Sequence, residues 1–284
     1  MKNLFKVFIL FIGIVNLALA QDKLVVSVSV IPQAYFVNKI SGGLIDVNIM
    51  VDSKNSPETY EPSINQLKDL EKSKLYFLIN MPFEKAWINR FKSVNKNIKF
   101  IQPMEDNQLE NYYKKFGYEE HEDDSHEHIP HIWLSFMLAK NHIRVIANTL
   151  KEVDSNNANL YEKNAQSLIE DIDALYTKYK NLFKNKNKSF LVYHPAFEYI
   201  ANELGIKEYS IEQDGKDAKI GNLRDIFTII KENNISTIFI QPQFSDKHAM
   251  LIAKEAKLDV KVADPLAYDW LENINKILQM IHEN

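Results

Sequence analysis

The chain has 284 residues, with 34 Lys and Arg against 38 Asp and Glu, and a formal net charge of −4. This acidic balance argues against nucleic acid as a partner. Only seven glycines occur, none in a G-x-G-x-x-G or Walker spacing, which argues against a phosphate-cradling nucleotide site. Because the chain has no cysteine, it has no disulfide framework, no thiolate for catalysis or metal binding, and no lipid-bearing cysteine.

Residues 1–20 have the pattern of a secretory signal peptide. Two lysines precede an apolar run over Val7 to Val15, and Ala18-Leu19-Ala20 provides an A-x-A cleavage site. The apolar run is shorter than the roughly 20 residues needed to span a bilayer. We therefore expect a mature chain that starts at Gln21 and works in the periplasm as a monomer without a lipid anchor.

Residues 21–153 alternate apolar strand patterns with helical patterns, which predicts an N-terminal α/β lobe. Strands are expected at 24–30, 47–51, 75–79 and 98–101, and helices at 34–40 and from Pro62 onward. The pattern dissolves over 105–130, an acidic stretch that carries His121, His126 and His128. Its low hydrophobicity and dense charge predict a loop.

A long helix is predicted within the segment 154–186. Its apolar seam has spacings of four and three residues and no interrupting Gly or Pro, at Tyr161, Ala165, Leu168, Ile172, Leu175, Tyr179 and Leu182. A helix over about 29 residues would be roughly 43 Å long, enough to brace two lobes.

Strand and helix patterns alternate again over 187–284, which predicts a C-terminal α/β lobe. Strands are expected at 190–193, 208–211, 236–240 and 260–263, and helices at 196–204, 223–232, 246–256 and from Asp269. The predicted fold class is therefore α/β, with two βα lobes, each with a mostly parallel sheet, joined by one long backbone helix.

Four residues stand in turns where such a fold would place a ligand. In open α/β sheets, ligands bind beyond the carboxyl ends of strands. Glu58, His131, His194 and Asp264 meet that condition, and we expect Pro195 to take the first position of the following helix. Two imidazoles and two carboxylates suit a divalent cation such as Zn²⁺ or Mn²⁺.

Each of these residues also has a simpler interpretation. A strand-end histidine is more often hydrogen-bonded in the core than bound to metal. An acid readily stabilises the start of a helix, and Asp before Pro forms turns. The metal-site prediction therefore depends on the four residues converging.

The chain resembles the zinc- and manganese-binding receptors of ABC importers, the cluster A-I or ZnuA/TroA-like group. The resemblance covers the whole mature chain and is carried by Ser56-Pro57-Glu58-Thr59-Tyr60-Glu61-Pro62, Pro130-His131-Ile132-Trp133-Leu134-Ser135, Tyr161 to Ala165, Tyr193-His194-Pro195-Ala196-Phe197, Gln241-Pro242-Gln243-Phe244 and Asp264-Pro265-Leu266. It implies that His131 and His194 are metal ligands and that Asp264 is the carboxylate of the second lobe. Two departures stand out, because Glu58 replaces the usual histidine of S-P-H and Gln241 replaces an acid. A carboxylate still binds Zn²⁺, so Glu58 is kept as a ligand.

The resemblance implies a substrate-binding protein that captures Zn²⁺ between its lobes and delivers it to an inner-membrane permease. The stretch with His121, His126 and His128 is similar to the His-rich loops of zinc receptors in this family, and its implied use is to collect zinc. Two histidines with two carboxylates is instead the ligand count of the manganese receptors. Mn²⁺ therefore remains the alternative.

Two other classes of protein compete with a receptor. A metal-dependent periplasmic hydrolase would leave one coordination position to water beside a general base. No H-E-x-x-H motif is present in the sequence. A surface adhesin would need a stalk, repeat or anchor, and none is visible. We therefore expect no enzymatic activity.

Overall fold

The computed structural model describes residues 23–104, 107–116, 130–212, 220–245 and 247–284. The predicted signal peptide and the three loop histidines His121, His126 and His128 lie outside these described residues. Within the described part, no helix combines the length and apolar character that crossing a bilayer requires.

The N-terminal lobe is built on four parallel strands in the order β2-β1-β3-β4. The strands are β1 (Val25–Val28), β2 (Asp46–Ile49), β3 (Leu75–Phe77) and β4 (Lys99–Ile101). The helices that connect them are α1 (Ile31–Ser41), α2 (Ile64–Leu70) and α3 (Pro82–Val94). All four predicted strands are confirmed, which fits their short, β-branched, apolar runs.

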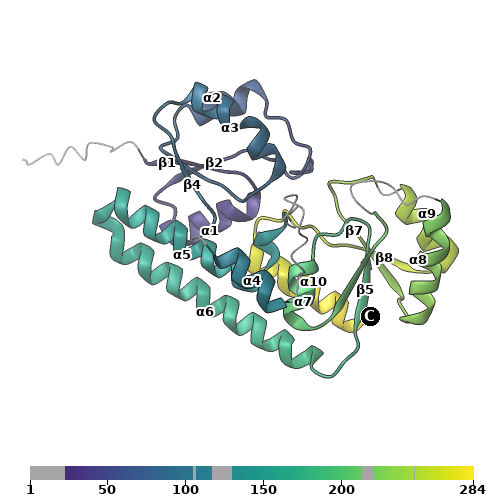
Figure 1. The fold of residues 1–284 in the computed structure, drawn as a ribbon. Coiled ribbons are helices and arrows are strands. Elements are labelled where there is room, and N and C mark those ends of the chain that lie inside the picture. The colour runs from purple at the N-terminus through teal and green to yellow at the C-terminus, as the bar shows by residue number, and fades with distance from the viewer. Residues whose placement is uncertain (1–22, 105–106, 117–129, 213–219, 246) are drawn as a thin grey trace, which may run out of the picture.

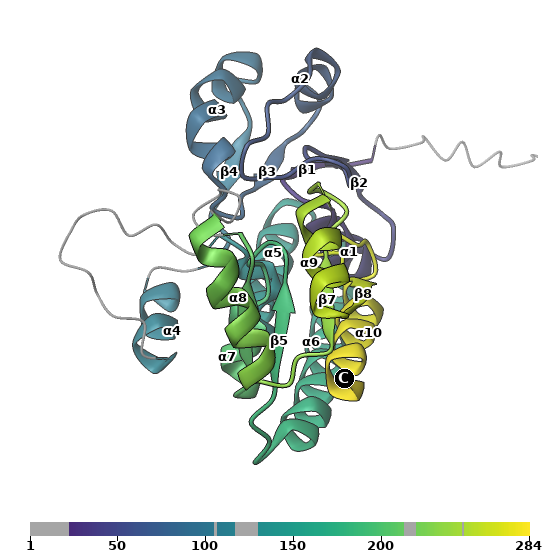
Figure 2. The ribbon, with the colours of Figure 1, turned by 90° about the vertical axis from the view of Figure 1, so that its right-hand side faces the viewer.

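The C-terminal lobe repeats this arrangement, with four parallel strands in the order β6-β5-β7-β8. The strands are β5 (Ser189–Val192), β6 (Lys207–Ser210), β7 (Thr237–Ile240) and β8 (Asp259–Val262). The helices are α7 (Glu198–Leu204), α8 (Ile220–Glu232), α9 (Lys247–Ala256) and α10 (Trp270–Glu283). Figures 1 and 2 show α8 and α9 together on the outer side of this sheet. Both lobes thus share one strand order, although the sequence has no visible repeat.

The helical elements that lie between β4 and β5 in the chain connect the two lobes. These elements are α4 (Gln108–Phe116), the 3-10 turn η1 (Ile132–Leu134), α5 (Phe136–Val153), the 3-10 turn η2 (Ser155–Asn157) and α6 (Ala158–Phe183). The predicted long helix is confirmed, and its 26 residues correspond to about 39 Å. Figure 1 shows α6 running beneath both lobes. Tyr161, Leu168, Ile172 and Tyr179 on its predicted seam are buried.

One hydrophobic cluster extends from the N-terminal sheet through α5 and α6 to α10. Trp270 of α10 lies at its centre, with ring centroids 5.8 Å from Phe36 of α1 and 5.9 Å from Phe136 of α5. A second cluster, around Leu191 and Ile238, fills the outer side of the C-terminal sheet. The larger core is therefore shared by both lobes.

The prediction of a loop over 105–130 is wrong for residues 108–116, which form α4. Tyr112 is buried there, with ring centroids 4.5 Å from Phe116 and 5.3 Å from Tyr199 of α7. Apolar side chains at Leu109, Tyr112 and Phe116 follow a helical spacing. The packing of this apolar face therefore favours a helix, although charged residues surround it.

Candidate metal centre

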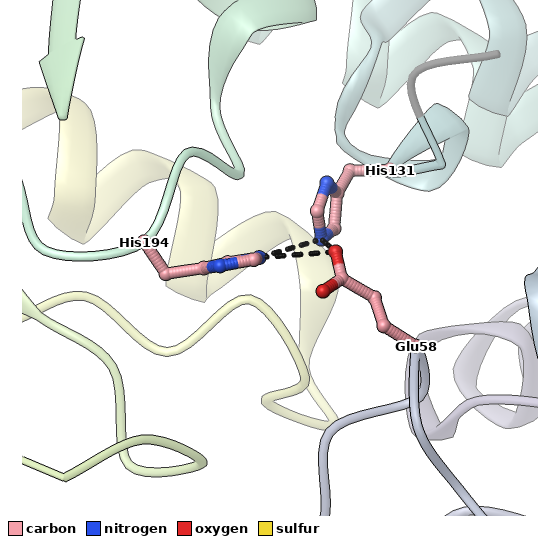
Figure 3. A group of neighbouring side chains, drawn as sticks. All are labelled: Glu58, His131 and His194. Atoms are coloured by element: carbon pink, nitrogen blue, oxygen red, sulfur yellow. Dashed lines mark hydrogen bonds and ion pairs between the residues drawn. The ribbon is translucent and has the colours of Figure 1, made fainter. Parts of the chain in front are cut away.

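Three predicted ligands, Glu58, His131 and His194, meet where the two lobes face each other (Figure 3). Glu58 lies in the connection between β2 and α2, His131 directly precedes η1, and His194 follows β5. Their ligand atoms all lie within 4.8 Å of one another. The sequence therefore identified three side chains that the fold brings together from remote stretches.

The three ligand atoms form a nearly equilateral triangle. Oε1 of Glu58 lies 3.2 Å from Nε2 of His194 and 3.6 Å from Nε2 of His131. The two Nε2 atoms are 3.4 Å apart. Tetrahedral Zn²⁺ with bonds of about 2.0 to 2.1 Å separates its ligand atoms by roughly 3.3 Å. The triangle therefore has the dimensions of one face of a zinc coordination tetrahedron.

Burial differs among the three ligands. The side chains of His131 and His194 are each 4% exposed, whereas that of Glu58 is 24% exposed. A cavity of about 10 Å³ lies beside the histidines, lined also by Trp133 and Gln243. This is roughly the space of one water molecule. Of the three side chains, Glu58 is therefore the most accessible to solvent.

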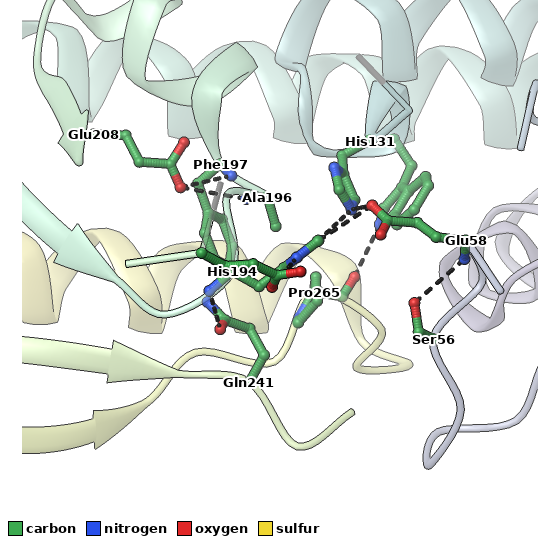
Figure 4. Close-up of polar contacts among 11 residues, drawn as sticks. Ser56, Glu58, His131, His194, Ala196, Phe197, Glu208, Gln241 and Pro265 are labelled. Atoms are coloured by element: carbon green, nitrogen blue, oxygen red, sulfur yellow. Dashed lines mark hydrogen bonds and ion pairs between the residues drawn. The ribbon is translucent and has the colours of Figure 1, made fainter. Parts of the chain in front are cut away.

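His194 is fixed from three directions. Its Nδ1 lies 2.8 Å from Oε2 of Glu212. Its backbone N–H donates to Oε1 of Gln241 at 3.0 Å, a contact drawn in Figure 4. The Phe244 ring stacks on the imidazole, with centroids 4.1 Å apart. A carboxylate on Nδ1 fixes the ring and leaves Nε2 to bind metal. Gln241, which replaces an acid of the family pattern, therefore supports His194 through the backbone.

Glu212 was not identified from the sequence. It is 7% exposed and follows β6 by two residues. The rule that selected the other candidates, a polar residue just beyond the carboxyl end of a strand, applies to Glu212 as well.

The surroundings of the two imidazoles shift their pKa values in opposite directions. Burial alone would lower the pKa of His194, but hydrogen bonds to Glu212 and Glu58, with the charges of both, raise it to about 9. Burial lowers the pKa of His131 to about 3, and the charge of His194 acts in the same direction. Burial opposes ionisation of Glu58, yet contact with His194 and the charge of His131 lower its pKa. The two carboxylates beside His194 thus favour its protonated form when no metal is bound.

The segment that carries His131 is held by buried hydrogen bonds. Nε1 of Trp133 donates to the carbonyl of Pro265 at 2.8 Å, and Nε1 of Trp270 donates to the carbonyl of Trp133 at 2.7 Å. Ser135 caps α5 by accepting from the N–H of Leu138 at 3.0 Å. These contacts tie the histidine segment to the C-terminal lobe.

Asp264 follows β8 as predicted, but it is not a member of the mutual 4.8 Å group formed by the other three among the described residues. Its Oδ1 accepts from Nε2 of Gln243 and from the N–H of Leu266, both at 2.9 Å. Oδ2 has no protein partner among the described residues. The role of Asp264 as a ligand remains a prediction.

The helices after two candidate segments begin later than predicted. Helix α2 starts at Ile64 instead of Pro62, because Ser63 and Gln66 form a capping box. Helix α7 starts at Glu198, so Pro195 is not at its first position.

The later start of α7 has its own cause. Oε1 of Glu208 accepts the N–H of Ala196 at 3.3 Å and the N–H of Phe197 at 3.1 Å (Figure 4). These contacts hold the residues after His194 in an irregular turn. Burial raises the pKa of this carboxyl to about 8.

Comparison with known proteins shows similarity over most of the chain. A family model described as zinc-uptake complex component A, periplasmic (ZnuA), matches residues 26–284. The zinc-binding lipoprotein AdcA of Streptococcus pneumoniae serotype 4 (strain ATCC BAA-334 / TIGR4) is 27% identical over 255 residues, which cover 87% of this chain and 51% of AdcA. The chain therefore spans about half the length of AdcA.

Two further relatives are covered more fully. The high-affinity zinc uptake system protein ZnuA of Bacillus subtilis (strain 168) is 29% identical over 271 residues, which cover 86% of this chain and 79% of that protein. A crystal structure of ZnuA superposes with a TM-score of 0.81 at 33% identity, over 92% of this chain and 99% of that one.

The two lobes, the long helix beneath them and the order of the strands define the two-lobed α/β class to which the matched ZnuA structure belongs. The resemblance noted in the sequence is thereby confirmed. The chain belongs to the ZnuA family.

Proposed function

We propose that this protein is the periplasmic receptor of a zinc ABC importer, which captures Zn²⁺ between its lobes and hands it to an inner-membrane permease. The triangle of Glu58, His131 and His194 carries the proposal, because its edges of 3.2 to 3.6 Å fit one face of a zinc tetrahedron. Asp264 is proposed as the fourth ligand, turning its free Oδ2 toward the ion. Relatives named as zinc uptake or zinc-binding proteins support the choice of zinc.

Capture by this site requires neutral imidazoles, since protonated nitrogens have no lone pair for the metal. Zn²⁺ therefore competes with the proton on His194, and affinity falls as the pH falls. A receptor needs a closed ligand shell and no activated nucleophile, which separates it from the metal-dependent hydrolase considered above. Four protein ligands around the bound ion, with no coordinated water beside a spare carboxylate, would support the receptor.

Metal identity is tested with protein purified without added metal. Elemental analysis is expected to find zinc, and competition against a chelator is expected to give tighter binding of Zn²⁺ than of Mn²⁺, as the general affinity order predicts. A preparation that carries manganese and binds it more tightly than zinc would instead favour the manganese receptor.

Several finer features belong to the same proposal. The receptor works as a monomer without a lipid anchor, and the long helix α6 limits lobe rotation during release. Scattering profiles with and without metal should therefore give nearly the same radius of gyration.

The stretch 119–128, with His121, His126 and His128, is proposed to collect zinc weakly and pass it inward. Deleting residues 119–128 should slow zinc uptake under scarcity, and unchanged uptake would contradict this role.

A further inference from the structure

The loop that follows β7, residues 241–244, lies against the metal triangle from the C-terminal lobe. Gln241 accepts the backbone N–H of His194, and Phe244 stacks on its ring. Between these two residues lies Gln243. Its side chain contacts both the loop that leads to Glu58 and the segment that carries Asp264.

The two hydrogen bonds of Gln243 fix the orientation of its amide. Nε2 donates to the carbonyl of Ser53 at 3.0 Å and to Oδ1 of Asp264 at 2.9 Å. A carbonyl and an ionised carboxylate are acceptors only, so the NH₂ end must face them. Ser53 belongs to the loop that leads to Glu58. One amide therefore fastens the loops of both carboxylates, one from each lobe.

The same argument directs the carbonyl oxygen of Gln243 away from Ser53 and Asp264. Oε1 is buried and has no hydrogen-bond partner among the described residues. Gln243 also lines the small cavity beside His131 and His194. A buried carbonyl oxygen without a partner carries a free-energy cost. A cation in the cavity would remove that cost.

We propose that Gln243 is a specificity-determining residue of the metal site, with its NH₂ group positioning Asp264 and its carbonyl oxygen serving as a neutral oxygen donor to the captured ion. The proposal rests on the proposed function, since it assumes that the triangle holds a divalent cation. Carbonyl and carboxylate oxygens suit Mn²⁺, which prefers six ligands, whereas Zn²⁺ is satisfied by four. Gln243 thus adds more to Mn²⁺ affinity than to Zn²⁺ affinity and widens the range of metals that the receptor accepts.

The test compares full-length wild type, Gln243→Leu and the control Gln279→Leu, all metal-free. Gln279 is an exposed glutamine on α10 whose Nε2 donates to Glu283, so its replacement removes an amide far from the site. Zn²⁺ and Mn²⁺ affinities are measured by chelator competition. Gln243→Leu is expected to lose affinity for Mn²⁺ about tenfold more than for Zn²⁺, whereas the control should match wild type for both ions.

Equal losses for the two ions, or no loss for either, would overturn the proposal, because a merely structural role weakens both alike. Wild type that binds Zn²⁺ but binds Mn²⁺ as poorly as Gln243→Leu would overturn it too. Failure of wild type to bind either ion would instead refute the proposed function itself. A crystal structure of the Mn²⁺-loaded wild type gives a second test that needs no variant, and an ion without Oε1 of Gln243 in its coordination shell overturns the proposal.

Discussion

Trp133 donates its indole N–H to the carbonyl of Pro265 over 2.8 Å, and this bond joins the segment after His131 to the segment after Asp264. Both residues are buried, and no other donor among the described residues reaches that carbonyl. The two segments are therefore held in one arrangement before any metal arrives.

Trp133→Phe keeps an aromatic ring but removes the N–H, so the carbonyl of Pro265 loses its partner. The free energy of unfolding of the metal-free protein should fall by about 1 to 3 kcal/mol. Urea unfolding monitored by circular dichroism measures this change. Trp87→Phe is the matched control, because the Trp87 indole has no hydrogen bond among the described residues. Equal losses in the two variants would contradict a specific role for the bond.

Glu212→Gln should weaken zinc binding about 10- to 100-fold, because the carboxylate fixes the His194 ring and raises its basicity. The change leaves the metal ligands themselves in place. Chelator competition measures the affinity, and Glu232→Gln, an exposed acid on α8, serves as the control. A variant that binds zinc as tightly as wild type would show that Glu212 has no part in the site.

Glu58→Ala removes one corner of the triangle and should lower zinc affinity about tenfold or more, as loss of one ligand does. Glu58→His restores a donor at that corner and should recover zinc affinity. It should also lower Mn²⁺ affinity relative to wild type, because imidazole suits zinc better than manganese. Titration of both ions into the two variants tests the pair, and weaker zinc binding in Glu58→His than in Glu58→Ala would exclude this corner as a ligand position.

The buried His142 of α5 makes folding depend on pH. Its Nδ1 lies 2.9 Å from the carbonyl of Pro103, and its Nε2 lies 3.0 Å from Nε2 of Gln33. Burial lowers its pKa from 6.5 to about 4. Between these values the unfolded chain binds the extra proton, so stability is present above pH 6.5 and is lost as the pH falls toward 4.

Lowering the pH from 7 to 5 should therefore cost wild type about 2 kcal/mol more than it costs His142→Asn, which cannot titrate at this position. Unfolding free energies of the metal-free proteins at both pH values give the difference. Parallel pH profiles would contradict the assignment.

The sequence was sufficient to predict the strands and the long helix, because their signals are local. Apolar runs such as Val25–Val28 and the unbroken seam of α6 need no knowledge of their neighbours. Helix α4 was missed because burial of Tyr112 against α7 depends on tertiary contact. The start of α7 was misplaced for a related reason, since Glu208 stabilises the turn after His194 from another strand. The start of α2 was misplaced although its signal, the capping box of Ser63 and Gln66, is local.

The site was predictable as a set of positions and not as a set of contacts. The rule that ligands bind beyond the carboxyl ends of strands selected Glu58, His131 and His194, which converge. It also selected Asp264, whose Oδ1 accepts a hydrogen bond from Gln243. Which polar residue hydrogen-bonds to a ligand side chain depends on the directions in which the side chains at that edge of the sheet point. The sequence alone therefore did not distinguish Glu212 as the partner of His194.

The hydrophobic cluster that passes from the N-terminal sheet through α6 to Trp270 makes the two lobes one cooperative folding unit. Cutting the chain between them would expose an apolar face on each fragment, so neither half is an autonomous domain. Calorimetry should give one transition, and an ion bound between the lobes stabilises all of the molecule through a single equilibrium.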